Sequence, residues 1–368
     1  MRDLINLIRR RLVQLTLAVP FILLSIQQKF KTLPQGRKSI VFTLDDDRLY
    51  RDEDGSGRYA YMILNRFSEG GYNVYFYKKV NFLGFFRLGR YGRFIYSIKN
   101  LKFITRLPAH SEDICYAFDH VRKDILKFNW KKLTYVNVLK PTFCQAGEMI
   151  NIPYFFHPVM YKLDQIGSVE GLRKNQRKLR IFFGGNTAKL YYDYHTVKGY
   201  NQLSRLEAIN ALLAVGGKIK SAEDIQKFYG ILNGNNHVNE CYLLRTDTTP
   251  RIGNGEWLNI VSKSDFFLCL SGTDLPMCHN AIEALAVGTI PIISYPDWFF
   301  PPLEHRKNAV EYYETYLTTA SFIRRFEASP GKVNTIMLHP RLLCSEKENE
   351  QGTCFLKELR EQLKEHSS

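Results

Sequence analysis

Residues 257–296 constrain the fold most, because their pattern gives one complete structural unit. The apolar, aromatic-rich run 265–270 predicts a buried strand that ends at the polar turn Ser271-Gly272-Thr273. Apolar residues at helical spacing predict a helix over about 278–287, and Gly288 ends it before a second buried strand. This order is a βαβ unit with parallel strands. Ligands of doubly wound folds bind at the carboxyl edge of such strands.

Glu283 is unusual because it lies one helical turn inside an otherwise apolar segment. A carboxylate on the crevice side of the helix can accept two hydroxyl groups of a ribose or a sugar. The backbone N–H groups at the start of the same helix can hold a phosphate. The alternative is that Glu283 lies on the solvent side of the helix.

Three stretches resemble the donor-binding half of GT-B glycosyltransferases, and in particular the exostosin-like family. They are RIFFGGN at 180–186, SDFFLCLSG at 264–272 and HNAIEALAVGTIPII at 279–293. The resemblance covers residues 179–296, about a third of the chain. It implies an α/β fold of two Rossmann-like domains with an interdomain cleft, and a nucleotide-sugar donor as substrate.

The chain departs from that family just before the helix that carries Glu283. Exostosin-like proteins usually have Ser-Arg there, whereas this chain has His279-Asn280. The positive charge opposite the donor phosphates would therefore come from Arg245 or Lys189, although Arg245 can also be an ordinary surface cation. The residues predicted to bind the donor are Asn186, Lys189, Arg245, Ser271, Gly272, Thr273, Asn280 and Glu283. Cations and backbone N–H groups can stabilise a leaving diphosphate, so neither a metal nor another cofactor is expected.

Catalysis also requires a base that deprotonates the acceptor hydroxyl. We expect it in the N-terminal domain, and Asp54, beside Gly55-Ser56-Gly57, is the first candidate. The run Asp45–Asp47 and the pair Asp119-His120 are further candidates, because burial can raise the pKa of an aspartate toward that of a base. The predicted catalytic residues are Asp54, Glu283 and His279. His279 can instead cap its helix, and Asp54 can be a solvated loop residue.

Two other functions remain open from the sequence. Asp45, Asp46 and Asp47 follow a predicted strand, and GT-A glycosyltransferases bind a divalent metal through Asp-x-Asp in that position. An acidic loop at the end of a strand is the simpler interpretation. The other possibility is a non-catalytic, membrane-bound protein that binds a nucleotide or a polyanion.

A chain of 368 residues is long enough for two domains. The segment 152–175 looks like the link between them. Apolar residues at helical spacing predict an amphipathic helix over 205–215, and a polar stretch follows it as far as Asn239. The predicted parts are a membrane-associated segment at 1–33, an N-terminal acceptor domain at 38–170, a C-terminal donor domain at 171–320 and C-terminal helices at 321–368 that cross back.

The net charge of +15 comes from two segments, 1–40 with +7 and 78–106 with +8, and both are rich in large apolar residues. This combination favours an anionic membrane surface as partner over nucleic acid. The apolar run 12–26 would rise roughly 22 Å as a helix, less than the roughly 30 Å of a bilayer core. We expect it to lie in the interface, with a signal peptide or a tilted anchor as alternatives.

The chain has seven cysteines, which form no CxxC pair, and it has no Asn-x-Ser/Thr sequon. Both features favour the reducing cytosol over a secretory compartment. The sequence therefore predicts a peripheral or monotopic enzyme on the cytoplasmic face of the inner membrane. Its acceptor would be a lipid-linked or envelope glycan, such as lipopolysaccharide or capsule.

Overall fold

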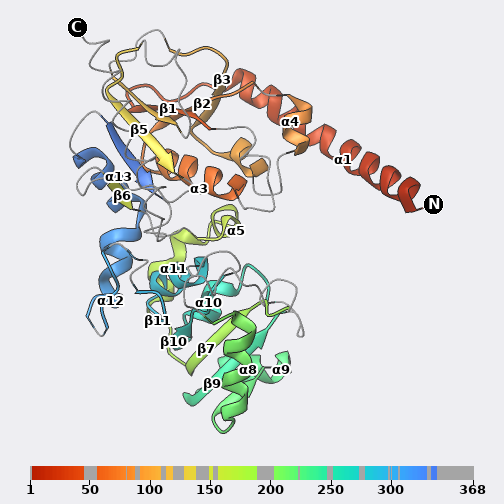
Figure 1. Ribbon diagram of the computed structural model, residues 1–368, viewed down its shortest axis with the longest axis vertical. Coiled ribbons are helices and arrows are strands. Elements are labelled where there is room, and N and C mark those ends of the chain that lie inside the picture. The colour runs from red at the N-terminus through yellow and green to blue at the C-terminus, as the bar shows by residue number, and fades with distance from the viewer. Residues whose placement is uncertain are drawn as a thin grey trace, which may run out of the picture. The chain divides into compact units, whose positions relative to one another are not determined.

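The protein is an α/β structure with two parallel sheets, each in its own compact unit (Figure 1). Unit 1 comprises Met1–Asn151 and Phe322–Ser368, and unit 2 comprises Ile152–Ser321. The computed structural model describes residues 2–44, 56–79, 81–87, 92–108, 113–118, 128–137, 149–151, 156–188, 203–222, 224–246, 252–272, 278–296, 299, 301–305, 307–329 and 333–337.

The sheet of unit 1 has the order β3-β2-β1-β4-β5-β12-β6, with parallel pairing throughout. The strands β3-β2-β1-β4-β5 follow the Rossmann order. Successive strands are added on one side of β1 as far as β3, and on its other side from β4 onward. The strands are β1 (Ser39–Thr43), β2 (Asn73–Tyr77), β3 (Leu101–Ile104), β4 (Ile114–Phe118), β5 (Lys132–Asn137), β6 (Met149–Asn151) and β12 (Val333–Met337). The helices are α1 (Arg2–Phe30), α3 (Ser56–Glu69), α4 (Phe82–Arg87), the 3-10 helix η1 (Gly92–Ser97) and α13 (Thr319–Ala328).

Aromatic packing holds helices on one face of this sheet. Phe42 of β1 and Phe67 of α3 lie 5.4 Å apart between ring centroids, and Phe67 also meets Phe326 of α13 at 4.9 Å. Successive side chains of a strand point to opposite faces, so Val41 faces the other way. There it packs in a buried cluster with Tyr116 and its neighbours.

The sheet of unit 2 is also parallel, in the order β11-β10-β7-β9-β8. The strands are β7 (Leu179–Gly185), β8 (Ile219–Ser221), β9 (Val238–Arg245), β10 (Ser264–Leu268) and β11 (Ile290–Ile292). The helices are α5 (Pro158–Lys162), η2 (Ile166–Ser168), α6 (Val169–Leu172), α8 (Arg205–Val215), α9 (Ile225–Asn233), α10 (Trp257–Val261), α11 (His279–Ala286), α12 (Ala309–Tyr312) and the π-helical turn η5 (Tyr313–Leu317).

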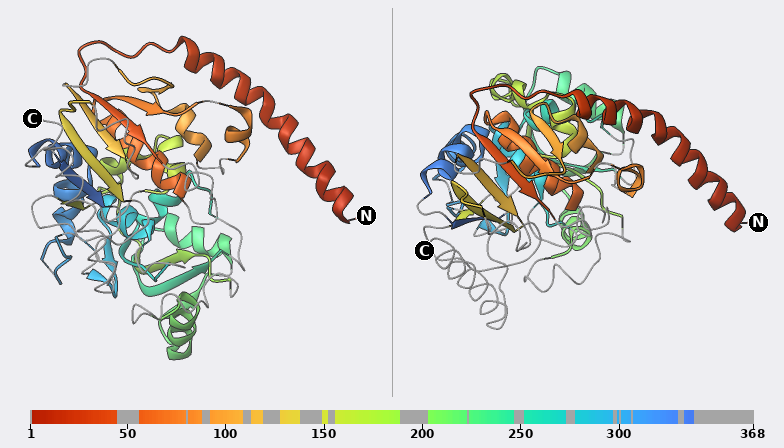
Figure 2. Two further views of the ribbon diagram at one scale, coloured as in Figure 1. Left: turned by 45° about the horizontal axis from the view of Figure 1, so that its top comes forward. Right: turned by 90° about the horizontal axis from the view of Figure 1, so that it is seen from above.

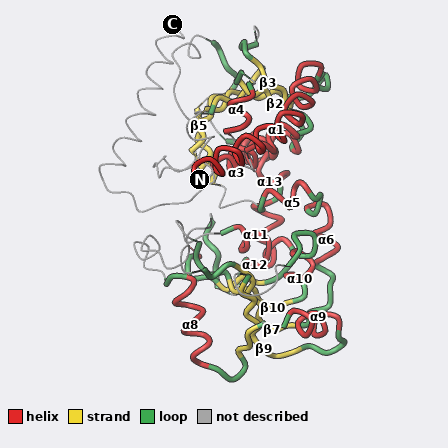
Figure 3. Tube along the Cα trace, turned by 90° about the vertical axis from the view of Figure 1, so that its right-hand side faces the viewer, coloured by secondary structure: helices red, strands yellow, loops and turns green. Residues whose placement is uncertain are grey.

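Helices cover both faces of this second sheet. Phe182 of β7 contacts Phe228 of α9 and Trp257 of α10, with ring centroids 5.5 Å and 6.2 Å away. The next residue, Phe183, points to the other face and packs with Ile209 of α8. Figure 3 accordingly shows α8 on one side of the strands and α9 and α10 on the other.

The structure confirms the order of strand, helix, glycine and strand predicted over 265–294, as β10, α11, Gly288 and β11. The second strand was predicted to be buried, but β11 is the edge strand of its sheet and its Ile290 and Ile292 are exposed. The structure differs from the sequence analysis in three further segments. Residues 158–172, predicted as part of a link, form α5, η2 and α6 of unit 2, which begins at Ile152. The polar stretch after α8 contains β8 and α9. Beyond α13, where only helices were expected, β12 adds a strand between β5 and β6.

The apolar run near the N-terminus belongs to α1, a helix of 29 residues that contains Pro20. Figures 1 and 2 show α1 as one continuous helix whose first turns extend away from the sheet of unit 1. None of the helices among the described residues combines the length and the hydropathy that crossing a membrane requires.

Candidate functional site

The strand order of unit 2 places a topological switch point between β7 and β10. After β7 the chain continues to β8 and β9 on one side of the sheet, and after β10 it continues to β11 on the other. The loops that leave β7 and β10 therefore diverge, and a doubly wound sheet binds its ligands where such loops diverge. These loops begin at Asn186 and at Cys269.

Arg205 bridges the two diverging loops. Its guanidinium donates to the carbonyl oxygens of Asn186 at 3.0 Å and of Leu270 at 3.4 Å, and the residue is buried. A capping box fixes its place, because Ser204 and Glu207 bond each other's backbone at the start of α8. Arg205 was not among the site residues predicted from the sequence. The Ser-x-x-Glu signature locates the helix start, but nothing in it shows that the next side chain turns inward.

Arg245 and Asn186 lie at the carboxyl ends of neighbouring strands. The last ladder pair of β7 and β9 joins Gly185 to Arg245. Arg245 Nε donates to the hydroxyl of Thr187 at 2.8 Å, and the side chain of Asn186 accepts from Ala188 N at 2.9 Å. The predicted donor-loop residues thus come together through strand pairing, and Arg245 belongs to this edge of the sheet.

Glu283 is fully buried, which excludes the solvent-facing alternative. One carboxylate oxygen accepts from the indole Nε1–H of Trp257 at 2.6 Å, and the other accepts from the backbone N–H of His157 at 3.1 Å. The indole ring of Trp257 packs directly against Gly184, where an added Cβ would lie 2.8 Å from Trp257 Cζ3. The carboxylate therefore positions α10 and the loop before α5. Because the carboxylate is fully buried, a donor hydroxyl could reach it only after the surrounding groups had moved.

Two predicted residues at the start of α11 face the ends of neighbouring elements. The imidazole of His279 lies 5.1 Å from that of His157 between ring centroids. The amide of Asn280 donates to the carbonyl oxygen of Gly184 at 3.4 Å. The amino end of α11 thus lies against the carboxyl end of β7, where backbone N–H groups favour an anion.

Two buried thiols lie on either side of the loop between β10 and α11. Cys269 follows β10 and Cys278 precedes α11, and Cys278 Sγ lies 3.6 Å from the carbonyl oxygen of Leu270. Burial raises the pKa of both thiols. The neighbouring guanidinium of Arg205 opposes that rise without cancelling it. Both thiols are therefore protonated at neutral pH.

The remaining predicted residues are described only in part. Ser271 is buried and Gly272 is half-buried, directly after Leu270. Lys189, Thr273 and Asp54 lie outside the described residues, as do Asp45, Asp46, Asp47, Asp119 and His120. In sequence these acidic groups follow β1 and β4, the two strands at the switch point of unit 1. Among the described residues, no cluster of three or more His, Cys, Asp or Glu side chains could hold a metal.

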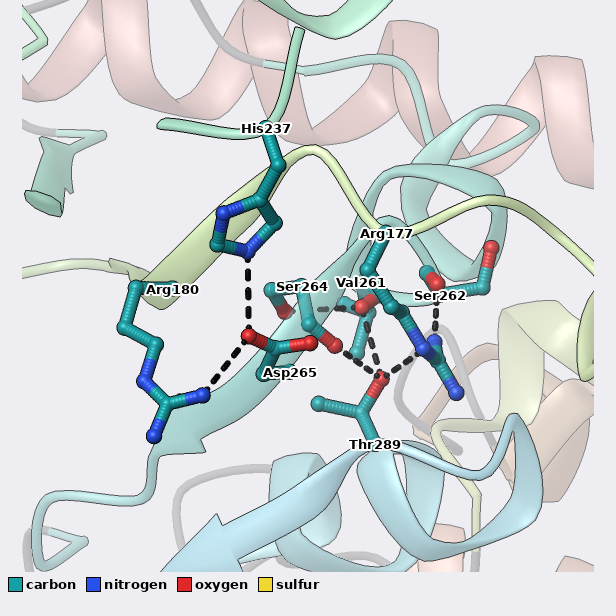
Figure 4. Close-up of polar contacts among 8 residues, drawn as sticks. All are labelled: Arg177, Arg180, His237, Val261, Ser262, Ser264, Asp265 and Thr289. Carbon is teal, nitrogen blue, oxygen red and sulfur yellow. Dashed lines mark hydrogen bonds and ion pairs between the residues drawn. The ribbon is translucent and has the colours of Figure 1, made fainter. Parts of the chain in front are cut away.

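The opposite, amino edge of the sheet is held by bonds within the protein (Figure 4). Asp265 accepts from Arg180 at 3.1 Å and pairs with His237 at 3.0 Å. Arg177 donates to Ser262 O, and to the hydroxyl of Thr289 at 3.2 Å. Burial lowers the pKa of Arg177.

Arginines also hold the carboxyl end of α11. Arg177 donates to Gly288 O at 2.8 Å and Arg173 to Ala286 O at 2.6 Å. Cations at this end of a helix complement its dipole. Arginines near the amino edge of the sheet thus hold the carboxyl end of α11. The amino end of the same helix lies at the carboxyl edge of the sheet.

Comparisons with protein-family models, with curated proteins and with solved structures found no match to this chain.

Proposed function

We propose that the protein is a GT-B glycosyltransferase that moves a sugar from a nucleotide donor to a lipid-linked or envelope glycan, such as lipopolysaccharide or capsule. The convergence of predicted donor residues supports this proposal. Asn186, Arg245, Asn280 and the turn Ser271-Gly272 come from distant parts of the sequence to one edge of the unit 2 sheet.

The chemistry of this edge fits a nucleoside diphosphate. Arg245 supplies a cation at the end of β9, and the amino end of α11 supplies backbone N–H groups. Arg205 fixes the distance between the two loops, because it bonds a carbonyl of each. In this proposal Glu283 is a positioning residue, His279 lies beside the donor, and unit 1 supplies the acceptor site and the base, with Asp54 as first candidate.

A thermal-shift screen of nucleotide sugars tests the donor site, because a ligand of the folded state raises the melting temperature. Two arginine variants make a matched pair. Arg245→Met removes a cation at the carboxyl edge, whereas Arg180→Met removes one at the amino edge. We expect one family of nucleoside diphosphate sugars to stabilise the protein, and Arg245→Met to weaken its binding at least tenfold. Arg180→Met should leave binding within about twofold.

A turnover assay distinguishes an enzyme from a protein that only binds the donor. Donor hydrolysis or transfer to lipid-linked acceptors is expected from the wild type without added metal. Binding without turnover would favour the non-catalytic alternative, and strict dependence on Mn²⁺ or Mg²⁺ would favour the metal-dependent one. Equal losses in Arg245→Met and Arg180→Met would overturn the assignment of the carboxyl edge.

A further inference from the structure

Helix α1 is attached to unit 1 along one side only in the described structure. Phe21 packs against Phe82 and Phe85 of α4, with ring centroids 5.4 Å and 5.5 Å apart. Seven residues later, the buried amide of Gln28 donates to Tyr96 O at 3.3 Å. Its amide oxygen also accepts a backbone N–H from β3. Phe21 and Gln28 therefore mark the face of α1 that is bound to protein.

A second apolar face of α1 points away from these contacts. Six large apolar side chains between residues 15 and 30 are each between 52% and 74% exposed. At about 100° per residue, all six fall within an arc of about 100°, and Phe21 and Gln28 lie on nearly the opposite side. The six residues, called here the α1 stripe, are Leu15, Val19, Ile22, Leu23, Ile26 and Phe30.

A single exposed apolar residue needs no explanation, but a continuous row along one helix face marks an interaction site. This exposed row is distinct from the face of α1 that packs within unit 1, because the half-buried residues of α1 lie on the docked side. These are Leu17, Ala18, Phe21, Leu24 and Ser25. The α1 stripe is therefore a separate surface.

Charge indicates which partner fits the α1 stripe. Residues 1–40 hold eight Lys or Arg and one Asp, and Lys29 Nζ lies 5.8 Å from the ring centroid of Phe30, at the end of the stripe. A second copy of α1 would bring like charges together at both ends of the stripe, in a parallel or an antiparallel pair. An anionic phospholipid surface complements them, because acyl chains receive the apolar side chains and headgroups receive the cations.

We propose that α1 lies in the plane of an anionic bilayer surface, with the α1 stripe at the boundary between headgroups and acyl chains. The docked face explains the in-plane orientation. A helix surrounded by lipid has apolar residues all round, whereas α1 buries the polar Gln28 against protein. This inference depends on the contacts of α1 and does not require glycosyl transfer.

Vesicle co-sedimentation of the full chain tests the proposal. The vesicles are phosphatidylcholine with about one third phosphatidylglycerol, compared with pure phosphatidylcholine. The double variant Ile22→Gln, Ile26→Gln removes two members of the stripe without changing the charge. The control Gln27→Ala changes an exposed polar residue of the same helix that lies off the stripe.

We expect the wild type to bind the anionic vesicles at least tenfold more tightly than the neutral ones. The double variant should lose at least tenfold of that binding, and Gln27→Ala should stay within about twofold. Melting temperatures should be equal for all three proteins, because the substituted side chains are exposed. Any nucleotide-sugar shift should also persist in the double variant, so that failure of the lipid inference and failure of the proposed function are distinguishable.

Three results would overturn the proposal. The first is no binding of the wild type to anionic vesicles, and the second is unchanged binding by the double variant. The third is a wild-type dimer in solution that the double variant converts to monomers, because the stripe would then be covered by a second copy of the chain.

Discussion

Trp257 donates its indole N–H to the carboxylate of Glu283 at 2.6 Å, and this bond joins the start of α10 to the middle of α11. Glu283 lies in the most constrained motif of the sequence, where a carboxylate that binds sugar hydroxyls is one interpretation. Its environment gives the carboxylate a second, structural role. Loss of activity on mutation of Glu283 is therefore not sufficient evidence of donor contact.

We predict that Glu283→Ala destabilises the fold by about 2–5 kcal/mol, because two buried N–H groups lose their acceptor. Glu283→Gln keeps one acceptor oxygen and should cost less. Denaturant unfolding followed by circular dichroism measures both. In a double-mutant cycle, Glu283→Ala and Trp257→Phe, which each remove the bond, should couple by more than about 0.5 kcal/mol. Additive effects would contradict a direct bond between these side chains.

Gly184 tests the packing behind the same carboxylate. An added Cβ would lie 2.8 Å from Trp257 Cζ3, so Gly184→Ala should destabilise the protein by about 1–3 kcal/mol. The control is Gly230→Ala in α9, where an added Cβ meets no heavy atom within 4 Å. Because alanine favours helix over glycine, the control should stabilise by about 0.5–1 kcal/mol. Effects of the same sign in the two variants would contradict the described packing.

The sequence predicts the parts of the fold that have regular periodicity. Helix α8 begins and ends at the predicted residues Arg205 and Val215, and α11 lies within one residue of its predicted ends. Both helices have apolar residues at helical spacing and a clear glycine stop. Strand β12 was missed because its pairing is with β5 and β6, almost two hundred residues earlier in sequence. Local patterns carry no information about such a distant partner.

The candidate site was predictable to a similar extent. The strand-end positions Asn186 and Arg245 follow from parallel pairing, which the sequence pattern indicates. The inward turn of Arg205 and the bond from Trp257 to Glu283 depend on tertiary packing. No local pattern distinguishes a buried arginine or a paired carboxylate from a solvated one.

Glu327 should make stability depend on pH in the acid range. Its carboxylate accepts from Lys38 Nζ at 2.6 Å, and this bond lowers the pKa of Glu327. A depressed folded-state pKa contributes stability above the unfolded value, about 4.3, and the contribution is lost as pH falls through the folded value. The difference in melting temperature between the wild type and Glu327→Gln should thus be positive at pH 6–7 and shrink below about pH 4.

The pair of Glu304 and Lys307, with an N–O distance of 2.7 Å, is more exposed than the pair of Glu327 and Lys38 and provides the control for this measurement. Solvent screens such a pair, so Glu304→Gln should leave the melting temperature nearly unchanged at every pH. A Glu327→Gln difference that stays constant from pH 7 to pH 3 would contradict a role for the ionised carboxylate.

Cys269 and Cys278 can report on the proposed donor loop, since they lie on either side of residues 270–277. Burial raises the pKa of both thiols, so alkylation at pH 7.5 requires local opening of the structure. We expect both to react slowly with iodoacetamide in the native protein and quickly in urea, as measured by peptide mass spectrometry. A nucleotide sugar bound to the carboxyl edge of unit 2 should slow this reaction further.

Cys241, whose pKa burial raises to about 11, lies within β9 and provides the internal control. Equal slowing at Cys241 would indicate general stabilisation of the fold, whereas selective slowing at Cys269 and Cys278 would locate the ligand at the loop.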